Sequence, residues 1–178
     1  MAALVSAARA LDLDLQHNAG SQETAMDIHA RNREALAAVQ ERRDEYYEAI
    51  LGLERAMAEA AGDDAAGWAS RAGNAALEMR SVLRHHITET EAVGGFYDDI
   101  AENYPNLANA ASKLRSDHAP LRAGVDQLVE TLSTVRDDVG VENARVEALD
   151  LLRGLLLHRH RGAELVYDAF NVDVATGD

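Results

Sequence analysis

Apolar residues recur along most of this chain at steps near 3.6 residues, which is the period of one face of an α-helix. No stretch longer than a few residues alternates apolar with polar side chains, so the pattern predicts no half-buried strand. Glycine and proline fall in a few clusters that would separate long helices. The sequence therefore predicts an all-α fold, an antiparallel up-down four-helix bundle with a short N-terminal extension.

Capping and breaking residues divide the chain into four predicted helices. Thr24 is a candidate N-cap for the first helix, Gly62-Asp63-Asp64 separates it from the second, and Gly94-Gly95 ends the second. Residues 96–104 are expected to form a connector with one helical turn, and Pro105 suits the first turn of the third helix. The predicted inward-facing residues of the four helices are, in order, Ile28, Ala35, Leu36, Val39, Tyr46, Ile50, Leu53 and Met57; Ala76, Met79, Val82, Leu83, His86 and Val93; Leu107, Ala111, Leu114, His118, Leu121, Val125, Leu128 and Leu132; and Val146, Leu149, Leu151, Leu152, Leu155, His158, Leu165 and Ala169.

The second half of the chain holds one further breaking residue inside a predicted helix. Pro120 lacks a backbone N–H, so a kink or a broken turn is expected in the turn before it. Residues 137–140 are expected to form the turn between the third and fourth helices. We expect an N-terminal extension at residues 1–21, the bundle at residues 22–172 and a C-terminal tail at residues 173–178.

The composition excludes several functional classes. The 178 residues include no cysteine, so disulfides, zinc–thiolate sites, iron–sulfur clusters and thiol nucleophiles are excluded. The net charge of −14 argues against nucleic acid and anionic membranes as partners, because an acidic surface repels phosphate. With no export signal and no 18-residue apolar run, we expect a soluble, cytoplasmic protein.

Histidine is the residue type whose placement points to chemistry. His17 lies in the polar segment before the first helix and is expected at the surface. The other six histidines place at least one imidazole on every predicted helix. They are His29 on the first helix, His85 and His86 on the second, His118 on the third, and His158 and His160 on the fourth. Imidazole is a common ligand of transition metals, and helix bundles build metal sites from inward side chains of facing helices.

Two of these histidines are expected to face each other. His118 lies 20 residues before Asp138, in the predicted turn, and His158 lies 20 residues after it. Because antiparallel helices share one rise per residue, the two imidazoles should lie at one level of the bundle. Both also belong to the apolar stripes of their helices, so we expect them to meet in the core.

The second helix offers two alternative ligand pairs. His85 and His86 precede Glu89 by four and three residues, so either imidazole can lie on the same face as that carboxylate. The apolar stripe favours His86, while the other histidine is expected to make an outer hydrogen bond. His29 lies 34 residues before Asp63 and His86 lies 23 after it, a mismatch of 11 residues or about 16 Å at helical rise.

Four short segments, taken in order, resemble the hemerythrin-like family, also called the HHE cation-binding domains. The strings Leu83-Arg84-His85-His86-Ile87-Thr88-Glu89 and Lys113-Leu114-Arg115-Ser116-Asp117-His118 are similar to its second and third helices. Residues 28–36 look like its first helix, and residues 155–158, continuing to Glu164, look like its last. The resemblance covers roughly residues 24–170.

This resemblance implies a non-haem iron site of one or two ions inside the bundle, which binds or senses dioxygen, nitric oxide or redox state. The ligands carried over from the family are His29, His85 with Glu89, His118 and His158. The chain also departs from the family pattern. Arg122 stands where the family commonly has a second histidine, and Gly162 and Ala163 stand where it has a carboxylate.

Glu164 is the nearest carboxylate on the fourth helix, and it pairs better with His160 than with His158. Three alternatives stay open: a distortion of the helix near Gly162, ligation by His160 and Glu164, or loss of a bridging carboxylate. Such a loss would leave one metal ion or none. The alternative function is therefore a metal-free helical regulatory or interaction module.

Two enzyme classes are disfavoured by the pattern, which otherwise does not decide whether the protein is an enzyme. A ferritin-like oxidase needs Glu three residues before His, and none of the seven histidines has it. A serine hydrolase needs a Gly-x-Ser-x-Gly elbow after a strand, and neither is present in the sequence pattern.

Overall fold

The computed structural model describes residues 41–175, with side chains through residue 169. The described part of the chain is helical and contains no strand, which confirms the all-helical prediction. Its elements are a helix at residues 41–58, α3 (Ala65–Thr90), α4 (Phe96–Asn103), a 3-10 turn η1 (Pro105–Leu107), α5 (Ala108–Thr134) and α6 (Asp138–Ala175).

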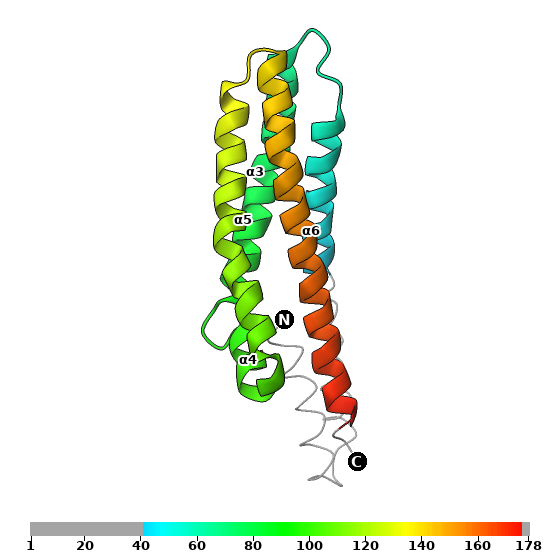
Figure 1. Ribbon diagram of the computed structural model, residues 1–178, viewed down its shortest axis with the longest axis vertical. Helices are drawn as coiled ribbons and strands as arrows, with labels where there is room; N and C mark the ends of the chain where they lie inside the picture. The colour runs from blue at the N-terminus through cyan, green and yellow to red at the C-terminus, as the bar shows by residue number, and fades with distance from the viewer. Residues whose placement is uncertain (1–40, 176–178) are drawn as a thin grey trace, which may run out of the picture.

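The long helices lie side by side along the longest axis of the molecule (Figure 1). The α5 helix contacts both α3 and α6, while the short α4 lies at the end of the molecule opposite the α5–α6 connection. Among the described residues, no helix is long and apolar enough to cross a membrane.

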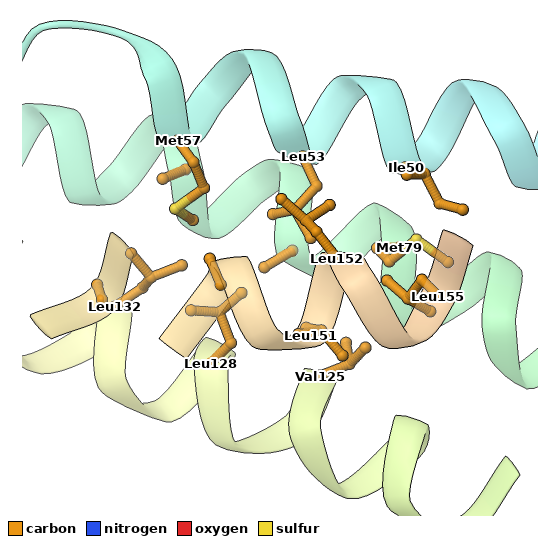
Figure 2. Packing of buried hydrophobic residues seen from close by; sticks show 14 of the residues in the cluster. Ile50, Leu53, Met57, Met79, Val125, Leu128, Leu132, Leu151, Leu152 and Leu155 are labelled. Atoms are coloured by element: carbon orange, nitrogen blue, oxygen red, sulfur yellow. The ribbon is translucent and has the colours of Figure 1, made fainter. Parts of the chain in front are cut away.

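The larger hydrophobic core receives side chains from the 41–58 helix, α3, α5 and α6 (Figure 2). Its fully buried members include Trp68, Ile50, Leu53, Met79, Leu128 and Leu155. Burying a side chain of this size contributes about 1.5–3 kcal/mol relative to leaving it in water, so this face of each helix is strongly specified.

A second, smaller core joins α4 to the neighbouring ends of α5 and α6. Phe96 and Ile100 of α4 pack there with Leu114 of α5 and Leu165 of α6. His118 lies between Leu114 of this small core and Leu121 of the large one. The boundary between the two cores is therefore where buried imidazoles gather.

The predicted break between the first two described helices is confirmed in detail. Gly62 has a φ of +55°, a conformation that side chains with a Cβ rarely adopt. Asp64 is the N-cap of α3, and its Oδ1 accepts a hydrogen bond of 2.8 Å from the backbone N–H of Gly67.

The end of α3 was predicted too late. The helix ends at Thr90, ahead of the predicted stop at Gly94-Gly95, and the backbone N–H of Glu91 closes its last turn onto the Ile87 carbonyl. Val93 therefore lies beyond the helix and is fully exposed, so its assignment to the apolar stripe was wrong.

The predicted connector contains a complete helix. Phe96, Tyr97 and Ile100 occupy one face of α4 and are buried, so this segment is more than the single turn expected. No broken turn occurs at Pro120, because α5 is helical throughout its length.

Two predicted core residues of the last helix are on its outer side. Val146 and Leu149 are more than half exposed, at 62% and 54%, whereas Ala144 and Ala148 are fully buried. In a helix rich in leucine and valine, the apolar period alone does not show which face touches the neighbours. The small alanines form the contact face here.

Several predictions concern residues outside the described range of 41–175. They include the helix start at Thr24, the extension at residues 1–21, and the positions of His17 and His29. These stay predictions.

Candidate metal centre

Three imidazoles from three helices meet at the boundary between the two cores. They belong to His86 of α3, His118 of α5 and His158 of α6. The Nε2 atom of His158 lies 3.2 Å from Nε2 of His86 and 3.3 Å from Nε2 of His118. One nitrogen from each ring lies within 4.8 Å of one from each of the others.

The meeting of His118 and His158 confirms the register argument from the sequence. The α5 and α6 helices are joined by residues 135–137, and equal helical rise carries the two side chains to the same level. Both rings are 2–3% exposed, as their place on the apolar stripes predicted. Of the two adjacent histidines on α3, the structure brings His86 into the group, the one favoured by its stripe.

The spacing of these nitrogens fits a metal ion. Nitrogen ligands about 2.05 Å from a tetrahedral metal lie about 3.3 Å from one another. The two Nε2 separations of 3.2 and 3.3 Å match this value. A single cation between the rings would therefore need little movement of the helices.

Carboxylates behind two of the rings orient their nitrogens. The Nδ1 atom of His118 donates a hydrogen bond of 2.6 Å to Oε1 of Glu91. The Nδ1 atom of His158 lies 3.6 Å from Oδ2 of Asp117, near enough for the charge to favour a proton on that nitrogen. Both contacts place the proton on Nδ1, so the Nε2 lone pairs face the centre of the cluster, as in carboxylate–histidine–metal arrangements.

The imidazoles are also kept neutral, which is the form that binds metal. Burial lowers the pKa of His86 to about 3, and repulsion from the neighbouring histidines lowers it further in the same direction. Burial and His118 lower the pKa of His158 to about 4. Burial also lowers the pKa of His118, against the opposing effect of Glu91. At neutral pH three lone pairs thus converge without a compensating charge.

Two tyrosines complete the surroundings of the cluster. The Tyr97 hydroxyl lies 3.3 Å from Nε2 of His118. The Tyr46 ring centre is 5.1 Å from that of His86, and the Tyr46 hydroxyl is buried without a hydrogen-bond partner among the described residues. Burial raises the pKa of both phenols.

A pocket of about 70 Å³ opens beside the cluster. Its lining includes His86, His158, Tyr46, Tyr97, Gly162 and Ala163. A Cβ atom added at Gly162 would meet nothing within 4 Å, so the place where the resemblance expects a carboxylate is open space. The volume suits a ligand of a few atoms.

The remaining sequence candidates lie apart from the cluster. His85 is exposed, and its Nε2 lies 3.2 Å from Nη1 of Arg42 and 3.4 Å from Oε1 of Glu89. Glu89 lines the pocket but forms an ion pair with Arg42. Adjacent helical residues point about 100° apart, which is why His85 and His86 cannot share one site.

On α6, the structure separates Glu164 from the three-histidine cluster. Its Oε1 lies 3.3 Å from Nε2 of His160, and both side chains are exposed, at 60% and 69%. The predicted apolar wall is divided among three places, because Leu114 lines the pocket, Leu121 and Leu155 lie in the large core, and Leu165 lies in the small one. His29 lies outside the described residues.

Sequence reasoning had assigned no role to Glu91 or Tyr97. Glu91 follows the helix end, 27 residues from His118, and no periodic pattern joins the two. Tyr97 could have been found, because Phe96, Tyr97 and Ile100 carry the i, i+3 and i+4 spacing of a short buried helix.

The comparisons with known proteins leave the identification to the site itself. No family model matches the chain, and no curated protein or solved structure matches it. The functional argument therefore rests on the geometry of the histidines, tyrosines and carboxylates described above.

Proposed function

We propose that this protein is a non-haem iron-binding protein of hemerythrin-like type that binds or senses dioxygen, nitric oxide or redox state. The observation that carries the proposal is the convergence of His86, His118 and His158 at metal-ligand spacing in a buried position. A buried lone histidine is readily explained by packing. Three neutral imidazoles directed at one point are better explained by a cation.

The proposed architecture is an antiparallel up-down four-helix bundle, as the resemblance implies. The first of the four long helices would extend from residues 41–58 back through the segment that contains His29. Support comes from the alternating connections in Figure 1, where the 41–58 helix joins α3 at the end of the molecule that also carries the α5–α6 connection. His29 would then be a candidate for a further ligand.

Each residue of the centre has a defined task in this proposal. Bound iron would supply an open coordination position and a change of redox state. His86, His118 and His158 would hold the ion, and Glu91 would fix the ring of His118 through its Nδ1 proton. The pocket beside Gly162 would admit a diatomic ligand while Leu114 and Phe96 keep its wall apolar.

Metal content tests the proposal directly. The full chain is loaded anaerobically with ferrous iron, desalted and assayed, and close to one or two equivalents are expected to remain bound. The double variant His118→Ala/His158→Ala should lose the metal, whereas His160→Ala, which changes an exposed histidine, should keep it. Exposure of the loaded protein to dioxygen or nitric oxide should change its absorbance.

Less than a tenth of an equivalent of iron or any other transition metal would refute this function. The metal-free regulatory module would then be favoured, provided that chelator leaves the melting temperature unchanged.

A further inference from the structure

The Tyr97 hydroxyl occupies the position expected of a fourth donor to the histidine cluster. Its oxygen lies 3.3 Å from Nε2 of His118, the same separation as between the Nε2 atoms of His118 and His158. This equals the edge of a tetrahedron of donors around one small cation, about 3.3 Å. The residue is 4% exposed, so its polar atom is directed into the protein at this point.

The fold holds this phenol in place from several sides. Phe96 and Ile100 anchor α4 in the small core. The Arg115 guanidinium lies 5.6 Å from the centre of the Tyr97 ring and is bound to Asp98 of the same helix at 2.7 Å. Rotation of the ring away from the histidines would break this packing.

Thr90 adds a polar contact that leaves the phenol oxygen available. The Thr90 hydroxyl donates its single proton to the His86 carbonyl at 2.8 Å. It also forms a side-chain hydrogen bond with Tyr97, in which Thr90 can therefore only accept. The lone pairs of the Tyr97 oxygen remain free to face the cluster.

We propose, building on the iron-binding function above, that the oxygen of Tyr97 is the fourth protein ligand of the metal and that it makes the centre select ferric iron. As the metal–oxygen bond forms, the phenol O–H bond breaks and the proton passes to solvent, with no change in oxidation state. Three imidazoles alone would suit zinc, copper or ferrous iron about as well. A phenolate is a hard anionic donor, which favours the smaller and more highly charged ferric ion.

The charges around the centre agree with a ferric ion. Three neutral imidazoles and one phenolate leave a net charge of +2 on a ferric complex. Glu91 lies 2.6 Å from the Nδ1 atom of His118, and Asp117 lies 3.6 Å from the Nδ1 atom of His158, so two carboxylates balance that charge. A divalent ion with the same ligands would need only one of them.

Tyr46 is the competing phenol and provides the comparison. Its hydroxyl is buried without a partner among the described residues, and it lines the pocket. No contact joins its oxygen to a cluster nitrogen, in contrast to Tyr97 and His118. We assign Tyr46 to the pocket wall, where its O–H can donate to a bound small ligand.

Optical spectroscopy of the iron-loaded chain tests the assignment. Ferric iron bound to a phenolate gives a broad visible charge-transfer band, and excitation in that band enhances tyrosinate ring vibrations in the Raman spectrum. Both signals are expected in the unmodified protein, in Tyr46→Phe and in Tyr167→Phe, whose exposed ring is a matched control. Both should be lost in Tyr97→Phe, together with at least about a 10-fold loss of ferric affinity.

The outcomes separate this inference from the function on which it rests. Iron bound without tyrosinate vibrations in the unmodified protein would overturn the role of Tyr97 and leave iron binding intact. A band that survives in Tyr97→Phe but disappears in Tyr46→Phe would also overturn it. Failure to bind iron would refute both proposals. Because the unmodified protein gives the first of these results, the test does not depend on the folding of Tyr97→Phe.

Discussion

Acidification should destabilise the metal-free protein through its buried histidines. Unfolding returns each imidazole to an ordinary pKa near 6.5, whereas the folded protein lowers the pKa of His86 to about 3 and that of His158 to about 4. Below pH 6.5 the unfolded chain therefore binds protons that the folded chain excludes. Their contribution to stability is complete above pH 6.5 and is lost as the pH falls toward 4.

The size of this loss follows from the two shifted values. Within that range each histidine costs up to about 1.4 kcal/mol of unfolding free energy per pH unit. Because the unfolded imidazoles are about 90% protonated between pH 6 and pH 5, His86 and His158 together should cost about 2.5 kcal/mol over that interval. His118 acts in the same direction, because its pKa is lowered too.

Urea unfolding of chelator-treated protein at pH 7, 6 and 5, at constant ionic strength, measures this effect. The double variant His86→Gln/His158→Gln should show a smaller fall in stability between pH 6 and pH 5, by about 2.5 kcal/mol. His160→Gln should behave as the unmodified protein, since that side chain is exposed. Equal falls in the double variant and the unmodified protein would refute the reasoning, as would folded-state titration of both rings near pH 6.5.

Two further predictions concern the orientation of one ligand and the packing of two helices. Glu91→Gln weakens the acceptor for the His118 Nδ1 proton, so metal affinity measured by competition with a chelator should fall by about 10-fold, and an unchanged affinity would exclude this role. Gly73→Ala, with open space around the new methyl group, should raise the unfolding free energy by about 0.5–1 kcal/mol. Gly154→Ala places the methyl 3.0 Å from a Leu121 methyl carbon, so its gain should be smaller or reversed, and equal gains would contradict this packing.

The helices and the depth of two ligands could be predicted from local rules. Apolar spacing located α3, α5 and α6 because helical periodicity is a property of each segment by itself. The level of His118 and His158 followed from a count of 20 residues on each side of a turn, since helical rise is nearly constant. The preference for His86 over His85 came from its alignment with Met79 and Leu83.

Other parts of the site depend on contacts between segments that share no sequence pattern. Glu91 approaches His118 because α3 ends where α5 passes, and Arg42 takes up Glu89 from a neighbouring helix. The exposed positions of Val146 and Leu149 were likewise hidden, because both faces of α6 carry apolar residues.

The sequence by itself determined that the chain is helical and that His118 and His158 lie at one depth, because rise and periodicity are fixed by backbone geometry. Only the tertiary structure decided which further groups join them. Tyr97 reaches His118 through α4, a helix too short to announce itself by its period, and it is held there by packing against α5 and α6. Such placement depends on how separate helices fit together, which no single segment encodes.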